Sequence, residues 1–306
     1  MNQSAVVIFN PRSGAHKRRD RATEIQNYIQ LLNRYGIIAE PWPTTGPNDA
    51  TRLAHEAVVK GVDVVIASGG DGTLNEVLQG MARSQTPLGI FPGGTANVLA
   101  NDLNIPADPE ANARFIAEGH RRPITIGLAG NRYFFLMAGI GLDAAMVKNV
   151  DSSLKAKLGE GAYLISGLQH LVKQPQTFTV EVNGQSYQSG FVVIGNSKGY
   201  GGGFSLTPHA SLFDPQFEVS IFPPKSFGFE YLPFAITTLV SSVDKMKGVI
   251  KLHSSHIKAY GLETNQPWVQ VDGELLGPLP MEFSSFSSFL SFLSFSSLFN
   301  FENLEP

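Results

Sequence analysis

Hydrophobic residues in the first third of the chain alternate between continuous apolar runs and helical spacing. Apolar residues recur every three or four positions over 20–34, 50–57 and 74–81, the spacing of helices with one buried face. Strand candidates precede and separate them: "AVVIF" (5–9), "GIIAEP" (36–41), "VDVVIAS" (62–68) and "PLGIFP" (87–92). This alternation predicts a mostly parallel, doubly wound α/β sheet.

From about residue 123 the pattern changes to short strands joined by tight turns. "PITIGLAGNRYFFLMAG" predicts two strands around Gly130-Asn131, and "TFTVEVNGQSYQSGFVVIGN" predicts a hairpin around Asn183-Gly184. Further strands are expected at 217–222, 256–262 and 268–274. We therefore expect an α/β domain followed by an all-β domain, an antiparallel sandwich or a similar β structure. The predicted boundaries are 1–127 and 128–283.

The last segment, 284–306, begins with a stretch made almost wholly of Ser, Phe and Leu. It has neither clear alternation nor a single helical period. A low-complexity tail, a surface-seeking segment and a frameshifted terminus all fit this composition. We interpret it as an atypical tail whose sequence departs from whatever originally ended the fold, with a natural tail as the alternative.

Composition excludes several classes of function. The chain of 306 residues has a net charge of −3, so no broad electrostatic attraction to nucleic acid is expected. It has no cysteine, which excludes disulfides and thiolate chemistry and agrees with a reducing cytoplasm. We expect neither a signal peptide nor a membrane-spanning segment.

Three glycine-bearing polar loops follow the first, third and fourth predicted strands: "NPRSG" (10–14), "GGDGT" (69–73) and "PGGTAN" (92–97). Carboxyl ends of parallel strands meet at one sheet edge, where ligands bind. Glycine lets consecutive backbone N–H groups approach an anion, and Thr73 could begin a helix whose N-terminus adds partial positive charge. Asp71 would repel a bare phosphate, so its expected role is to hold Mg²⁺.

These loops predict a phosphate or nucleotide site, against the simpler interpretation that each is an ordinary turn. None of them carries the lysine of a GxxxxGK[ST] loop, and none fits GxGxxG.

The ordered series "NPRSG", "GGDGTLNEVLQG" and "PLGIFPGGTANVLANDL" resembles the catalytic domain of the diacylglycerol kinase family, which includes bacterial soluble lipid kinases, sphingosine kinases and ceramide kinases. The resemblance continues through "GIGLDAAMV", "GNSKGYGGGFSLTPHASLFDPQFEV" and "VQVDGE", and covers about residues 5–283. GGDGT alone is shared with NAD kinases and phosphofructokinases, whereas the complete series is more specific.

The resemblance implies an N-terminal domain similar to that of NAD kinase, a C-terminal β-sandwich, and ATP bound in the crevice between them. Thr45, or its neighbour Thr44, is implied as one nucleotide contact. The other implied ATP contacts are Asn10, Pro11, Arg12, Ser13, Gly14, Gly70, Asp71, Gly72, Thr73, Leu74, Asn75, Glu76 and Thr95.

Two acids flank a glycine in "VQVDGE", at the end of a predicted strand. Taken alone this is a common acidic turn. The resemblance implies that Asp272 or Glu274 is the general base that accepts the proton of a lipid hydroxyl. Both remain candidates, with Glu274 as the first choice.

The segment "PHASLFDPQFEV" resembles the structural Mg²⁺ loop of the family. Asp214 would supply its carboxylate, and Ser211 and Gln216 their carbonyl oxygens. Pro215 replaces the usual glycine, so a metal-free turn is an equal alternative. Val98 stands where many members have aspartate, and the Ser/Phe tail replaces the usual final strand, which would expose a sheet edge.

The resemblance implies an ATP-dependent lipid kinase of phospholipid metabolism, with Mg²⁺ and with diacylglycerol or a related lipid as acceptor. The alternatives are a soluble-substrate kinase of the NAD kinase type and a non-catalytic nucleotide- or lipid-binding homologue. We expect a cytoplasmic protein with peripheral membrane contact, no nucleic-acid partner and a possible homodimer.

Overall fold

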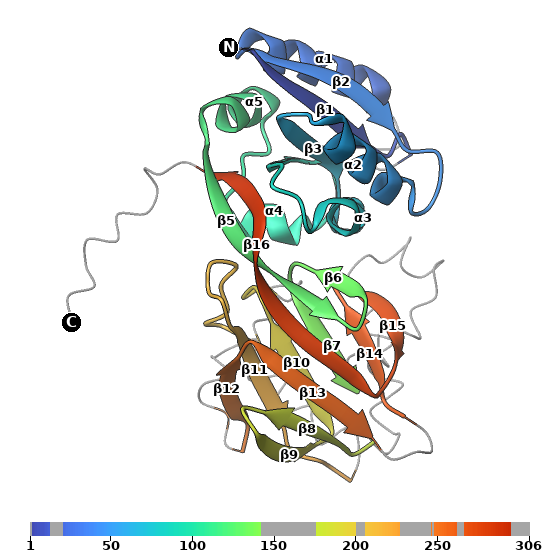
Figure 1. Cartoon of the computed structure of the whole chain (residues 1–306), viewed down its shortest axis with the longest axis vertical. Helices are drawn as coiled ribbons and strands as arrows, with labels where there is room; N and C mark the ends of the chain where they lie inside the picture. The colour runs from blue at the N-terminus through green and yellow to red at the C-terminus, as the bar shows by residue number, and fades with distance from the viewer. Residues whose placement is uncertain are drawn as a thin grey trace, which may run out of the picture. The chain divides into compact units, whose positions relative to one another are not determined.

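The computed structural model describes residues 2–12, 21–141, 176–199, 206–226, 246, 248–261 and 266–294 (Figure 1). The chain forms two compact units, 1–124 with 288–306, and 125–287. The helices are α1 (Arg21–Arg34), α2 (Asp49–Lys60), α3 (Asp71–Met81), α4 (Val98–Asp102) and α5 (Pro109–Glu118). The strands are β1 (Gln3–Phe9), β2 (Ile37–Pro43), β3 (Val64–Gly69), β4 (Leu88–Pro92), β5 (His120–Ala129), β6 (Arg132–Phe134), β7 (Met137–Gly141), β8 (Phe178–Val182), β9 (Gln185–Ser189), β10 (Phe191–Gly195), β11 (Phe217–Phe222), β12 (Ile250–Ser254), β13 (His256–Gly261), β14 (Trp268–Val271), β15 (Glu274–Pro278) and β16 (Met281–Ser294).

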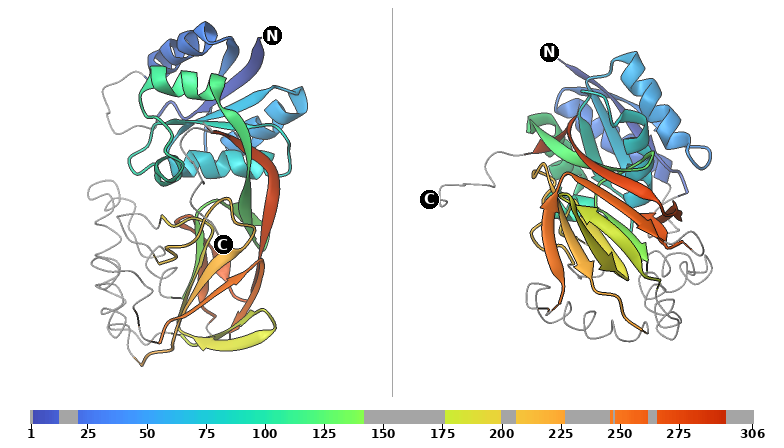
Figure 2. Two further views of the ribbon diagram at one scale, coloured as in Figure 1. Left: turned by 90° about the vertical axis from the view of Figure 1, so that its left-hand side faces the viewer. Right: turned by 60° about the horizontal axis from the view of Figure 1, so that its bottom comes forward.

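The first unit contains the predicted parallel sheet. Its strands follow the order β2-β1-β3-β4, and each neighbouring pair is parallel. The chain reverses its direction across the sheet after β2, so right-handed connections place α1 on one face and α2 and α3 on the other. α2 packs against α3, and α1 packs against α5 (Figures 1 and 2). The doubly wound α/β prediction is confirmed.

A buried polar group joins the helices of one face to the sheet. Tyr28 of α1 stacks on Phe91 of β4, with ring centroids 3.9 Å apart, and donates its hydroxyl hydrogen to Asn112 of α5. The Asn112 amide in turn donates to the carbonyl oxygens of Ile90 and Pro106. Burial raises the pKa of Tyr28 far above its ordinary value, which keeps the hydroxyl protonated as a donor.

The second unit is an antiparallel β-sandwich. One layer has the strand order β12-β11-β10-β7-β14-β15, and the other contains the first part of β16, β13, β8 and β9. Alternate side chains of both layers form one buried core, which includes Phe178, Phe217 and Phe283. The predicted antiparallel β-sandwich is confirmed for the described residues of this unit.

Both predicted turns form as expected. β8 and β9 pair around Asn183 and Gly184, whose φ angles of 52° and 76° are the positive values of a two-residue hairpin turn. β5 and β6 pair around Gly130, which also has a positive φ of 57°.

The expectation that the Ser/Phe run replaces the final strand is wrong. β16 extends to Ser294; its first residues pair with β13, and Phe292 pairs in parallel with Leu88 of β4. Strand pairing uses backbone groups, which any non-proline residue supplies, so an unusual composition does not prevent it. Residues 295–306 lie outside the described part of the chain.

We expect Tyr28→Phe to lower the free energy of unfolding of the first unit by about 1–3 kcal/mol, because it leaves a buried amide oxygen of Asn112 without its donor. The stacked ring is retained. Urea unfolding can be followed by Trp42 fluorescence in a Trp268→Phe background. Tyr35→Phe, which removes a more exposed hydroxyl hydrogen bond to Glu110, is the matched control. An equal effect of the two substitutions would contradict this interpretation.

Candidate functional site

Three loops meet at the carboxyl edge of the parallel sheet. Phe9 at the end of β1 pairs with Ser68 of β3, and Gly69 pairs with Pro92 of β4. The residues that follow these strands therefore start from neighbouring positions on one edge, as the sequence predicted. We call residues 69–73 the first glycine loop and 92–97 the second glycine loop.

The loop after β1 is attached to the loop after β2. The amide oxygen of Asn10 accepts the backbone N–H of Arg12 at 2.9 Å, and the Arg12 guanidinium donates to the carbonyl oxygen of Thr45 at 3.0 Å. Pro11 and Arg12 are exposed. Ser13 and Gly14, the other predicted nucleotide contacts of this loop, lie outside the described residues.

Thr45 is placed by an interaction with α2. Its backbone N–H and its hydroxyl both donate to one carboxylate oxygen of Asp49, at 2.9 and 3.0 Å. The hydrogen bond from the Thr45 backbone is the main cause that lowers the pKa of Asp49 below its ordinary value. Thr44, the alternative candidate, is buried and donates its backbone N–H to Phe9.

The first glycine loop leads directly into α3. A Cβ at Gly69 would lie 2.6 Å from the Thr73 hydroxyl oxygen, so the first turn of the helix needs glycine beneath it. Gly72 is exposed, whereas Leu74 and Asn75 are buried in the unit. Glu76 accepts the backbone N–H of Ala50 at the start of α2. Of the predicted contacts in this helix, the exposed backbone around Gly72 is therefore the most accessible.

The two glycine loops touch through their backbones. Gly93 donates its N–H to the carbonyl oxygen of Gly69 at 3.0 Å. A Cβ at Gly94 would overlap the Cα of Gly70, and a Cβ at Gly70 would lie 3.1 Å from the Cα of Gly94, so the contact leaves little space for a side chain. The edge of the sheet consequently presents bare backbone.

The side chain of Asp71, in the first glycine loop, caps the short helix α4. Asp71 accepts the backbone N–H groups of Val98 and Leu99 at 3.2 and 3.3 Å. The side-chain amide of Asn97 bonds both backbone groups of Gly94 at 2.9 Å, and Thr95 is exposed. Asp71 thus has a structural role that the sequence did not indicate, and its role as a Mg²⁺ ligand stays a prediction.

These contacts define a surface that suits an anion. The first N–H groups of α3 have no acceptor within their own helix, and the helix dipole adds partial positive charge at this end. Backbone N–H groups at a helix start, with glycine next to them, favour phosphate oxygens.

Asp272 lies in the tight turn between β14 and β15, with a φ of 48°, next to Gly273 with a φ of 81°. Its carboxylate accepts three backbone N–H groups, from Phe135 at 2.8 Å, Leu136 at 2.9 Å and Met137 at 3.0 Å. A carboxylate with so many fixed donors holds the segment between β6 and β7 in place.

Asn196 binds the carbonyl oxygens of two of the peptide groups whose N–H groups bind Asp272. Its side chain donates to the carbonyl oxygen of Phe135 at 2.7 Å, and its backbone N–H donates to the carbonyl oxygen of Leu136 at 2.8 Å. These two carbonyls belong to the peptide groups whose N–H atoms bind Asp272 Oδ1. Hydrogen bonds in such a chain polarise and strengthen one another. Asn196 therefore supports Asp272 through two peptide groups.

Glu274 begins β15 and points to a different environment. It is 51% exposed, and one of its oxygens accepts from the Arg132 guanidinium at 2.7 Å. The two acids lie two residues apart but differ in their partners. The Asp272 carboxylate accepts backbone N–H groups, whereas the Glu274 carboxylate is exposed and is bound by the Arg132 guanidinium.

The loop that resembles a Mg²⁺ site is closed by its own hydrogen bonds. Asp214 accepts the backbone N–H of Gln216 at 2.8 Å, and the carbonyl oxygen of Ser211 accepts the N–H of Asp214 at 2.9 Å. Among the described residues, no group of three or more His, Cys, Asp or Glu side chains is placed to hold a metal ion. One carboxylate oxygen of Asp214 is thus used within the turn, and the Mg²⁺ site at Asp214, Ser211 and Gln216 stays a prediction.

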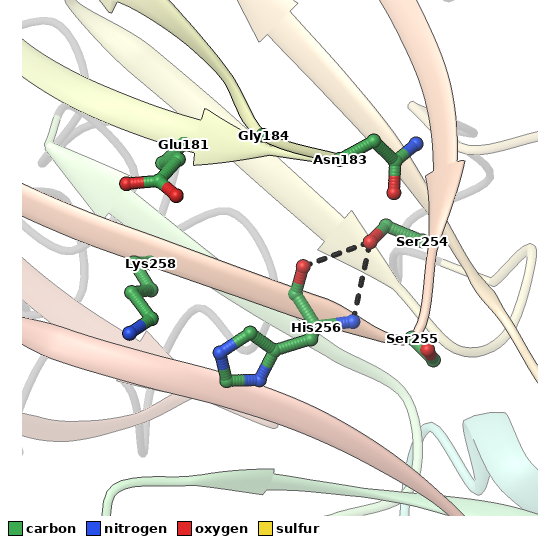
Figure 3. Close-up of a pocket in the computed structure, with 7 residues that line it drawn as sticks. All are labelled: Glu181, Asn183, Gly184, Ser254, Ser255, His256 and Lys258. Atoms are coloured by element: carbon green, nitrogen blue, oxygen red, sulfur yellow. Dashed lines mark hydrogen bonds between the residues drawn. The ribbon is translucent and has the colours of Figure 1, made fainter.

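A separate hollow of about 190 Å³ lies on the second unit, lined by residues of β8, β12 and β13 and their turns (Figure 3). The side chains that line it are polar or charged, and Ser254 exchanges hydrogen bonds with the backbone of His256. Small-molecule sites usually enclose about 300–1,000 Å³ with mostly apolar walls, so this hollow is not a candidate site.

Within the described residues, the helices are too short or too polar to cross a membrane.

Two residues with clear roles at these sites were missed in the sequence. Arg21 occupies a position on the apolar stripe of α1, four residues before Ile25, and it is buried. A charged residue on a buried stripe was the available signal. Asn196 directly follows the apolar strand β10, and only the fold shows which carbonyls its side chain reaches.

Comparison with known proteins agrees with this architecture. Residues 4–129 match the diacylglycerol kinase catalytic domain, and residues 137–294 match the YegS C-terminal NAD kinase beta sandwich-like domain. The chain is 31% identical to a diacylglycerol kinase of Bacillus subtilis (strain 168), over 91% of this chain and 92% of that protein. It is 32% identical to one of Staphylococcus aureus (strain bovine RF122 / ET3-1), over 92% and 90%.

A solved structure of a diacylglycerol kinase from Bacillus anthracis str. Sterne has the same fold, with a TM-score of 0.79, 23% identity and coverage of 97% of this chain and 99% of that one. The chain belongs to the diacylglycerol kinase family.

We expect Asp272→Asn and Asn196→Ala each to lower the free energy of unfolding of the second unit by about 1–3 kcal/mol, because each leaves buried backbone groups without a partner. Their effects should not add, since the Asn196 side chain and the Asp272 carboxylate bind opposite ends of the peptide group that joins Phe135 to Leu136, and a coupling of at least about 0.5 kcal/mol is expected. Urea unfolding followed by Trp268 fluorescence, in a Trp42→Phe background, measures this cycle.

The control pairs Asn196→Ala with Glu282→Gln on β16, an exposed glutamate 60% accessible to solvent. That pair should be additive. Additivity of Asp272→Asn with Asn196→Ala would show that the two residues act separately.

Proposed function

We propose that this protein transfers the γ-phosphate of ATP to the hydroxyl group of a lipid, diacylglycerol or a related molecule. The observation that carries the proposal is the direct backbone contact between the two glycine loops at the carboxyl edge of the sheet. Membership of the diacylglycerol kinase family supports the choice of a lipid acceptor.

In this proposal the first unit binds the nucleotide. The exposed backbone around Gly72 and the N-terminus of α3 contact phosphate oxygens, and Thr95 and Arg12 are further exposed donors near the same edge. Kinases use ATP with Mg²⁺, which neutralises phosphate charge, and we propose that the ion enters with the nucleotide.

Glu274 is the proposed general base. The lipid oxygen attacks the γ-phosphorus, the bond from that phosphorus to the β–γ bridging oxygen breaks, and ADP leaves. The hydroxyl proton passes to the Glu274 carboxylate. The contacts of Asp272 favour this assignment, because three of its acceptor positions are used by backbone N–H groups. Asp272 then acts by fixing the turn from which Glu274 projects.

The lipid is proposed to reach the protein from a membrane surface by peripheral contact.

A radiolabel assay with γ-labelled ATP and mixed micelles tests the function, with diacylglycerol, monoacylglycerol, a sphingoid base and ceramide as separate acceptors. NAD is included as a soluble acceptor. We expect labelled phospholipid and no labelled NADP. Labelled NADP alone would identify a soluble-substrate kinase, and tight ATP binding without any product would identify a non-catalytic homologue.

We expect Glu274→Gln to lower kcat by roughly 10²–10⁴-fold, the range for loss of a general base, with little change in the affinity for ATP. The substitution keeps the shape of the side chain while removing its ability to accept a proton. Steady-state kinetics with the lipid found in the acceptor panel measures it, and Glu282→Gln is the matched control. Full activity of Glu274→Gln would exclude this residue as the base.

A further inference from the structure

The Arg21 side chain is buried directly beneath the carboxyl edge of the sheet. It opens α1 and is only 6% exposed. Its Nη1 donates to Glu24 at 2.7 Å, and its Nη2 donates to the Ser68 hydroxyl at 2.7 Å. The guanidinium carbon lies 5.8 Å from the centroid of the Phe91 ring. The group is therefore held between α1, β3 and β4.

A buried guanidinium is costly unless its donors are used. Glu24 neutralises it in part, at a side-chain exposure of 29%. Its Nε is buried and finds no acceptor among the described residues. A methionine has a similar length and would fill this buried position without the cost of burying a charge. Packing alone therefore does not explain why an arginine stands here.

The guanidinium connects the starts of both glycine loops. Ser68 immediately precedes the first glycine loop, and Gly93 belongs to the second. A Cβ at Gly93 would overlap Nη2 of Arg21 and would lie 2.9 Å from its Cζ. Gly93 also donates its N–H to Gly69, so any shift of Gly93 is passed to the first glycine loop.

We propose that Arg21 is a positioning residue that fixes the position of the two glycine loops relative to each other. Position 93 is glycine because the Arg21 guanidinium occupies the space that a side chain would need. The hydrogen bond from Arg21 to Ser68 fixes the residue before the first glycine loop. The close approach of the guanidinium to Gly93 limits how near the second glycine loop can come to it. This inference rests on the proposed binding of ATP by these loops.

The test is a double-mutant cycle of Arg21→Met and Gly93→Ala in the full chain. Methionine retains the stem of Arg21 and lacks the terminal nitrogens that an alanine methyl at position 93 would meet. Calorimetry with ATP and Mg²⁺ gives the dissociation constant, and steady-state kinetics separates KM for ATP from KM for the lipid. Urea unfolding with Trp42 fluorescence gives the stability of the same four proteins.

We expect Arg21→Met to weaken ATP binding about tenfold, the scale of one hydrogen bond to a charged group. Gly93→Ala should weaken it at least as much, and the double variant should bind no worse than Arg21→Met. KM for ATP should rise while KM for the lipid stays within about twofold, because only the nucleotide loops move. Arg21→Lys should recover part of the affinity.

Two controls match these substitutions. Arg34→Met removes an arginine from the other end of α1, where the side chain is 69% exposed. Gly277→Ala adds a methyl group where no described atom lies within 4 Å. Neither should change the affinity for ATP.

Additive losses in the cycle, or equal changes in both KM values, would overturn the positioning role. If the wild-type protein does not bind ATP, the proposed function fails and the positioning role fails with it. The claim that the guanidinium excludes a side chain at position 93 is tested separately by the free energy of unfolding. Gly93→Ala should destabilise the wild-type protein more than it destabilises the Arg21→Met variant. Equal losses of stability would overturn this claim.

Discussion

The close approach of two backbones at the carboxyl edge of the parallel sheet is the constraint on which the proposed nucleotide site depends. Gly70 and Gly94 leave no room for a Cβ between them, and the hydrogen bond from Gly93 to Gly69 fixes the separation of their loops. Because side chains are excluded between the loops, only backbone groups lie at this contact. The start of α3 then adds its unpaired donors and its dipole. The phosphate contacts proposed here would be made by backbone groups and need no lysine, which agrees with the absence of the GxxxxGK[ST] pattern.

In the second unit, one acid is held by the backbone and another is left accessible. Asp272 is fixed by three backbone donors, and Asn196 holds the same peptide groups from their carbonyl side. This arrangement is a stiff support for the turn. Glu274, two residues later, stays half exposed beside Arg132. Two carboxylates of similar chemistry are therefore placed in different surroundings, which is the basis for proposing different roles for them.

Much of the fold could be predicted because the physical signals were local. The continuous run 5–9, the helical stripe around Tyr28 and the Asn183-Gly184 turn each impose their own element. The loops of the site were predictable for the same reason, since glycine after a parallel strand marks the binding edge. The Ser/Phe run misled because its composition lacks a period, whereas the pairing of β16 uses backbone groups that any such residue provides.

The sequence by itself determined the order of strands and helices, the glycine loops at one sheet edge and the acidic turn of residues 272–274, because each depends on neighbours within a few positions. Only the tertiary structure decided how the polar side chains are used. Asp71 caps α4, Arg21 supports both glycine loops, and Asp272 binds a segment 135 to 137 residues away in the chain. Hydrogen bonds and burial over such separations depend on folded geometry, and no local pattern of residues encodes them.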